Sequence, residues 1–140
     1  MCGASVSPNG EKEISWFPLT RKKGIPKWIG ELLPEKFTTF HWHGDTFDTP
    51  DSAVLLGSSA ACINQGFIMG DRVIALQFHP EMTSEGLKAL VEHCRGELDS
   101  SGSAWVQTER QILDGQHHLA ASHQIMEKLL DHCAWCIAGS

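Results

Sequence analysis

The first half of the chain alternates between apolar and polar positions with the period of two that predicts β-strands. The clearest run is KFTTFHWH at residues 36–43, where side chains at alternate positions share a face of the strand. Shorter runs at residues 13–19 and 53–59 also predict strands. Prolines, glycines and aspartates fill the intervening segments. We therefore predict a turn at residues 44–52 and a loop, with room for one helical turn, at residues 23–36.

Two further runs, residues 64–69 and 72–78, predict a β-hairpin because they flank Gly70 and Asp71. Glycine at the first loop position suits the positive φ of a two-residue type II′ turn. The second run begins with four continuously apolar residues, VIAL. Such continuity is typical of strands that are covered on both faces.

The second half of the chain has the period of an α-helix. Thr83 or Ser84 can cap a helix that continues through LKALVEHC, and Thr108 and Gln111 have the spacing of a capping box. The last helix is predicted at residues 120–137. Its apolar stripe contains Ile125, Met126, Leu129, Leu130, Cys133, Ala134 and Ile137.

These elements together predict an α/β fold, with a mixed sheet flanked by helices. The length favours a single domain over residues 1–140, with a strand-rich part at 1–82 and helices at 83–140. A short SSGS linker is expected at residues 100–103. The helices are few for a sheet covered on both faces, so we expect that part of the architecture is missing from this chain.

Charge and cysteine content limit the possible partners and locations. The net charge is −6 and the basic residues are scattered, which argues against a nucleic-acid partner. No apolar run approaches the roughly 20 residues of a transmembrane helix, and the N-terminus has no signal-peptide pattern, so no membrane association is expected. The five cysteines form an odd, irregular set. That usage favours reduced thiols and a cytoplasmic location.

The candidate chemistry lies at the end of the last predicted strand, in VIALQFHPEM. His79 and Glu81 are two residues apart, so in extended chain both side chains emerge on the same side. Pro80 ends the strand and leaves the two side chains at the sheet edge, where α/β enzymes keep their sites. A carboxylate beside an imidazole fixes its tautomer and prepares it to act as a base. By spacing alone, an ordinary surface pair at a strand-to-helix turn explains the pattern more simply.

Several co-linear motifs change this interpretation. QFHPEM resembles the signature that closes the active site of class I glutamine amidotransferases, particularly the GMP-synthase-like, free-standing members. The stretches that share the resemblance are PNGEKEISWFPL (8–19), FHWHGDTFDTP (40–50), AVLLGSSAACINQGF (53–67) and RVIALQFHPEM (72–82). The resemblance implies a flavodoxin-like fold and a Cys-His-Glu triad that hydrolyses the side-chain amide of glutamine or of a γ-glutamyl compound.

The resemblance also implies roles for individual residues. His79 would be the general base and Glu81 its orienting partner, while His43, Gly44 and Asp45 would form a strand-end loop that binds the substrate. Such a glutaminase needs no cofactor, and its ammonia could pass to a synthase partner. A small departure from the family pattern is Ser15, which stands where the family pattern has glycine.

The large departure is the nucleophile, because no G-x-C-x-G elbow occurs in the 140 residues. Cys2 has neither the preceding strand nor room for the helix that follows an elbow, so we do not assign it as the thiolate. The chain is therefore interpreted as the C-terminal part of an amidotransferase, inactive alone. The alternative is a non-catalytic remnant that serves as a binding or self-associating module. Exposed strand edges would then favour a homodimer.

Two other arrangements could carry chemistry. His41 and His43 share a strand face and could bind zinc together with a third group. Because the resemblance gives this segment another role, we expect no metal. Cys133 and Cys136 have the spacing of a redox pair, but they close the last helix, where the helix dipole does not activate a thiol. We expect them to serve in packing.

Overall fold

The computed structural model describes residues 3–98 and 102–138. The elements are, in chain order, β1 (Val6–Arg21), α1 (Lys27–Leu32), β2 (Lys36–Phe47), β3 (Val54–Leu55), β4 (Gly57–Ser58), β5 (Gly66–Met69), β6 (Val73–Leu76), α2 (Ser84–His93), the 3₁₀ helix η1 (Arg95–Glu97), α3 (Glu109–Asp114), the 3₁₀ helix η2 (Gly115–His118) and α4 (Leu119–Ala138). No helix within the described ranges combines the length and the apolar character that crossing a membrane requires.

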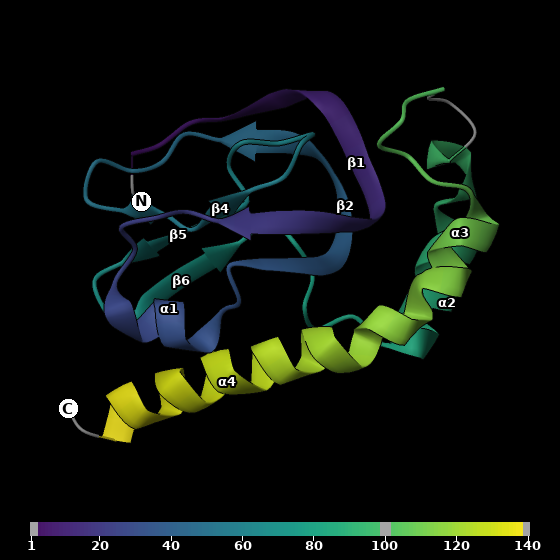
Figure 1. Cartoon of the computed structure of the whole chain (residues 1–140). Coiled ribbons are helices and arrows are strands. Elements are labelled where there is room, and N and C mark those ends of the chain that lie inside the picture. The colour runs from purple at the N-terminus through teal and green to yellow at the C-terminus, as the bar shows by residue number, and fades with distance from the viewer. Residues whose placement is uncertain (1–2, 99–101, 139–140) are drawn as a thin grey trace.

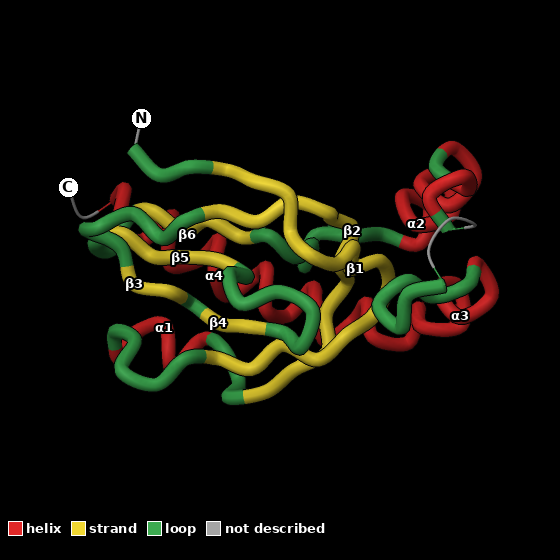
Figure 2. Tube along the Cα trace, turned by 90° about the horizontal axis from the view of Figure 1, so that it is seen from above, coloured by secondary structure: helices red, strands yellow, loops and turns green. Residues whose placement is uncertain are grey.

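The long antiparallel pair of β1 and β2 dominates the strand layer (Figures 1 and 2). The strands predicted at residues 13–19 and 36–43 are confirmed, but both are longer than predicted. β2 continues through residues 44–47, where we expected a turn, because this segment pairs with the early part of β1. The register shifts between Pro8 and Glu13, so one long strand curves without losing its partner.

The other strands complete two sheets. One has the order β2-β1-β4 and the other β3-β5-β6, and all their ladders are antiparallel. The run predicted as one strand at 53–59 is divided between them, with the fully buried Leu56 at the junction. The α/β class is confirmed, but the described strands form two antiparallel sheets rather than one mixed sheet.

The predicted hairpin is confirmed in β5 and β6, although its turn differs from the expected one. Met69 pairs with Val73, so the loop has three residues rather than two. Gly70 has a φ of 62°, the left-handed conformation for which glycine was expected.

Helix capping follows the sequence closely. The Thr83 side chain accepts a hydrogen bond from the Gly86 amide, and Thr108 and Gln111 form the predicted capping box. α4 coincides with the last predicted helix to within a residue at each end. Part of the predicted linker, residues 99–101, lies outside the described residues.

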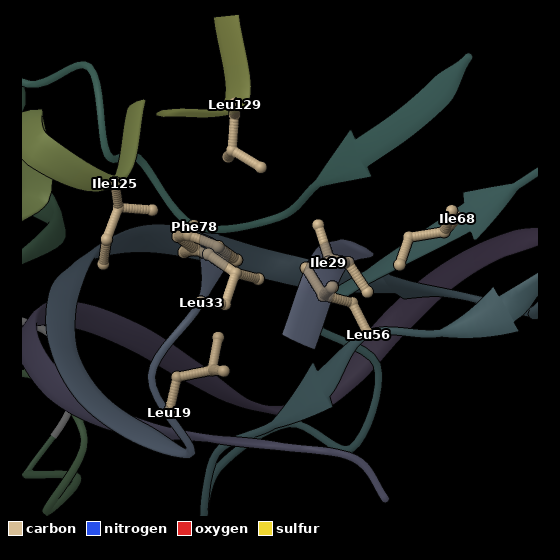
Figure 3. Packing of buried hydrophobic residues seen from close by; sticks show 8 residues of the cluster. All are labelled: Leu19, Ile29, Leu33, Leu56, Ile68, Phe78, Ile125 and Leu129. Carbon is tan, nitrogen blue, oxygen red and sulfur yellow. The ribbon is translucent and has the colours of Figure 1, made fainter. Parts of the chain in front are cut away.

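α4 runs beneath the strands and closes the main core (Figure 1). Ile125 and Leu129 point from this helix toward Phe78, Leu33 and the other apolar side chains of the cluster (Figure 3). The buried face of α4 contains Ser122, Ile125, Leu129 and Cys136. The predicted stripe was therefore only partly right, because Leu130 is 54% exposed and Ile137 is 77% exposed.

Ser15, where the resemblance led us to expect glycine, has an unusual backbone conformation. Its φ is 128°, in a region that residues with a side chain rarely adopt. The residue is fully buried in β1, and its hydroxyl donates a hydrogen bond to Gln107 Oε1 at 2.6 Å. This bond compensates for part of the backbone strain that glycine would avoid.

Candidate active site and its buried support

The segment that carries His79 is anchored by its neighbours. Phe78, only 2% exposed, is buried in the main core. The Gln77 amide donates a hydrogen bond to the Gln65 carbonyl at 3.0 Å, and the His79 amide donates to the Phe40 carbonyl at 2.8 Å. β6 ends at Leu76, so these bonds position the His79 backbone beyond the strand, beside β2.

His79 and Glu81 lie together as predicted, although Pro80 and Glu81 form a turn rather than the extended chain from which the prediction was argued. His79 Nδ1 is 2.8 Å from Glu81 Oε1. The two side chains are 36% and 53% exposed, which places them at the surface. A carboxylate can only accept a hydrogen bond, so in the neutral form of the ring Nδ1 carries the proton and Nε2 has the free electron pair. This is the tautomer that a general base requires.

His43, Gly44 and Asp45 lie within β2, not in the strand-end loop that we expected. The His43 side chain is only 7% exposed and faces the interior, whereas Asp45 is exposed. The Gln77 side chain donates a hydrogen bond to the Asp45 carbonyl at 2.9 Å, which ties this part of β2 to the segment that carries His79. Their role in substrate binding stays a prediction.

A buried polar cluster lies on the inner face of the β1-β2 pair. We call it the Glu13 cluster, and it consists of Glu13, His41, His43, Ser59 and Gln65. Four groups approach Glu13 Oε2: His43 Nε2 at 3.2 Å, His41 Nδ1 at 3.5 Å, Ser59 Oγ at 2.9 Å and Gln65 Nε2 at 2.6 Å. The side chains of Glu13 and His41 have no exposed surface.

Burial and charge act against each other in this cluster. Desolvation lowers the pKa of His41 to about 4, and the nearby Glu13 carboxylate only partly opposes this effect. Burial alone would raise the pKa of Glu13, but the interactions with His43, His41 and Ser59 outweigh it and hold that pKa below its usual value. His41 is therefore neutral and Glu13 ionised near pH 7.

Comparison with known proteins places these residues in a family. The sequence matches the family described as glutamine amidotransferase class-I over residues 20–94, more than half of the chain. The matched segment includes His79, Glu81 and the histidines of β2. The chain belongs to the class I glutamine amidotransferase family.

Individual relatives agree with this assignment. The glutamine amidotransferase-like protein YfeJ of Salmonella typhimurium is 32% identical over 108 residues, which are 76% of this chain and 45% of YfeJ. A glutamine amidotransferase structure from Thermotoga maritima matches with a TM-score of 0.80 and 29% identity, covering 94% of this chain and 55% of that one. A glutamine amidotransferase structure from Methylobacillus flagellatus matches with a TM-score of 0.87 and 24% identity, covering 95% of this chain and 56% of that one. At this identity the match supports the fold alone. The chain thus spans about half the length of these relatives.

The cysteines of this amidotransferase chain differ in their surroundings. Cys62 is buried, and its thiol contacts Thr46 Oγ1 and the Asn64 carbonyl, both at 3.5 Å. Cys133 and Cys136 lie near the end of α4 outside any disulfide, and Cys136 Sγ lies 3.4 Å from His132 Nε2. Cys2 lies outside the described residues.

Sequence reasoning missed Glu13 and Gln65 as members of a polar site. Each is fully buried, although its residue type is usually exposed. A signal was present for Glu13, because a charged residue directly precedes the apolar run of a predicted strand. Its partner could not be identified from the sequence, since the pairing of Glu13 with His43 depends on the register of β1 against β2.

Proposed function

We propose that this chain supplies the histidine and glutamate of a Cys-His-Glu triad that hydrolyses the side-chain amide of glutamine or of a γ-glutamyl compound. The observation that carries the proposal is the 2.8 Å contact between His79 Nδ1 and Glu81 Oε1 just beyond β6. It leaves the basic nitrogen, Nε2, on the other edge of a partly exposed ring. In a member of this family, a cysteine thiol is the group whose proton this base would accept.

The proposed reaction has two stages. A cysteine thiolate attacks the side-chain carbonyl carbon, and the carbon–nitrogen bond breaks as the His79 imidazolium gives its proton to the departing ammonia. A γ-glutamyl thioester is left. His79 Nε2 then takes a proton from water, whose oxygen attacks the thioester carbonyl, and glutamate leaves with the thiolate restored. Glu81 stabilises the imidazolium that His79 forms before it protonates ammonia and again after it takes the proton from water.

Substrate and ammonia also need partners. The Gly44 amide and Asp45 are proposed to bind the α-carboxylate and α-ammonium groups of the substrate, at the part of β2 that Gln77 ties to the His79 segment. Ammonia would pass to a synthase partner. A cytoplasmic location stays a prediction, which rests on the cysteine usage of the sequence.

A chimera tests the proposal. Residues 3–138 would replace the matching segment of the Thermotoga maritima amidotransferase. The chimera would keep the remaining half of that protein. We expect the 140-residue chain alone to release no ammonia from glutamine, whereas the chimera does so and loses the activity on thiol alkylation. A chimera that is folded by circular dichroism and still inactive would contradict the proposal. So would ammonia release by the isolated chain that His79→Ala abolishes.

Exposed apolar residues favour a second property, self-association. Leu130 and Ile137 are seven residues apart on α4 and so share one face, and they are 54% and 77% exposed. We propose that this face pairs two copies of the chain in a two-fold dimer.

Sedimentation at micromolar concentration checks this dimer. We expect the Ile137→Lys variant to dissociate into monomers, because it places a charge in the apolar interface. Gln124→Lys, at an exposed position on the same helix, adds the same charge and should remain dimeric. A parent chain that sediments as a monomer would rule out the dimer.

A further inference from the structure

We propose that Glu13, His41 and His43 bind a zinc ion in the core of this protein, at a site separate from His79 and Glu81. The sequence offered only two histidines for such a site. The fold adds the third donor, because the β1-β2 register places Glu13 opposite His43 and on the same side as His41. The inference does not depend on the proposed glutaminase activity.

The spacing of the three donor atoms fits a tetrahedral zinc ion. Zinc binds imidazole nitrogen and carboxylate oxygen at about 2.0–2.2 Å, so neighbouring donors around it lie about 3.4 Å apart. Glu13 Oε2 is 3.2 Å from His43 Nε2 and 3.5 Å from His41 Nδ1. All three donor atoms lie within 4.8 Å of one another. Small side-chain rotations would bring them to one ion.

Two of the three donor atoms lack the hydrogen bonds that buried polar groups normally make, whereas Glu13 Oε2 accepts hydrogen bonds from Ser59 and Gln65. Within the described part of the chain, neither ring nitrogen of His41 has a hydrogen bond of good geometry, and the same is true of His43 Nε2, Glu13 Oε1 and Gln65 Oε1. Buried polar atoms are almost always paired. His41 Nδ1 and His43 Nε2 both lie beside Glu13 Oε2, so a cation bound at this carboxylate oxygen would satisfy both unpaired nitrogens.

The tautomer of His43 supports the same conclusion. Its Nδ1 lies 3.3 Å from the Asp45 carbonyl, which can only accept a hydrogen bond, so Nδ1 carries the proton. Nε2 then directs a lone pair at Glu13 Oε2 from 3.2 Å, and two acceptors face each other. For a neutral His43, a metal ion between them resolves this conflict; a second proton on the ring is the alternative, and the zinc measurements below distinguish the two. Metal-bound histidines commonly donate their other N–H to a backbone carbonyl in this way.

The donor set indicates which ion fits. Two imidazoles and one carboxylate suit zinc, whereas magnesium and calcium prefer a shell of oxygen atoms. A fourth donor is close, since Gln65 Nε2 lies 2.6 Å from Glu13 Oε2 and a half-turn of the amide would present its oxygen there. With buried donors on all sides, the ion would be structural. It would fix the part of β2 that precedes His43. In that part of the strand, the Phe40 carbonyl accepts a hydrogen bond from the His79 amide.

Metal analysis of the 140-residue chain tests the proposal. The protein would carry Cys133→Ser and Cys136→Ser to remove thiol ligands, and it would be stripped with a chelator, reloaded with zinc and desalted. We expect one zinc ion per chain. Glu13→Gln and His43→Gln should each weaken zinc binding by more than about 100-fold, and Ser59→Ala, which removes hydrogen bonds to Glu13 Oε2 and Gln65 Nε2 but no proposed ligand, by about tenfold. His93→Gln, at an exposed histidine of α2, is the matched control and should bind like the parent.

Cobalt substitution provides a second readout that needs no core variant. Cobalt(II) in the protein with Cys133→Ser and Cys136→Ser should show the strong visible bands of a tetrahedral ion without a thiolate charge-transfer band. Circular dichroism shows whether each variant is folded. The proposal is overturned if the parent retains no zinc, if the folded Glu13→Gln and His43→Gln variants bind zinc as the parent does, or if cobalt shows no tetrahedral bands.

Discussion

Replacing His79 by alanine in the Thermotoga chimera is expected to lower the rate of ammonia release by at least about 1,000-fold. Alanine removes both the base that activates water and the acid that protonates departing ammonia. The fold should be unaffected, because the ring is partly exposed and is anchored through its backbone amide rather than its side chain. Coupled measurement of ammonia gives kcat and KM for the chimera and the variant.

Glu81→Gln separates orientation from binding in the same chimera. The amide is neutral and cannot stabilise the imidazolium, so kcat should fall by about 100-fold or more, with KM little changed. Glu85→Gln, at an exposed acid in the first turn of α2, is the matched control and should leave both parameters unchanged. An equal fall in kcat in both variants, or a change in Glu81→Gln that is confined to KM, would contradict the role given to Glu81.

The His79–Glu81 pair could be predicted from the sequence because its geometry is local. Residues with a single residue between them can meet through local geometry alone, on one side of an extended chain or, as here, across the turn formed by Pro80 and Glu81. The Glu13 cluster is different, since its members come from β1, β2 and the segment before β5. Their meeting depends on a register that shifts between Pro8 and Glu13, and no local pattern specifies such a shift.

The errors in the predicted elements have the same origin. Gly44 and Asp45 are turn-forming residues, yet β2 continues through them because β1 offers a partner there. The apolar run at 53–59 pairs first with β5 and then with β1, which divides it at Leu56. Local sequence preference determines where the capped helices begin, because the capping partners are adjacent in sequence. Tertiary pairing determines where the strands begin and end.

The largest stability effect is expected from Gly115→Ala, where α3 passes directly into η2. A Cβ at this position would lie 2.0 Å from Trp16 Cδ1 and 2.4 Å from its Nε1. The indole cannot retreat easily, because it is 6% exposed, donates a hydrogen bond to the Ile112 carbonyl at 2.9 Å and packs against Phe40. We expect the free energy of unfolding to fall by about 3 kcal/mol, at the upper end of typical overpacking costs.

Backbone preference does not explain such a loss, since Gly115 has a φ of −74° that alanine adopts freely. Gly96→Ala in η1 is the matched control, because no heavy atom lies within 4 Å of its added Cβ, and its stability should change by less than about 0.5 kcal/mol. Urea unfolding of both variants measures the difference. In a Trp16→Phe background the smaller ring leaves room at the same place, so Gly115→Ala should cost at least about 1 kcal/mol less there. An unchanged cost in that background would show that the clash with the indole is not the cause.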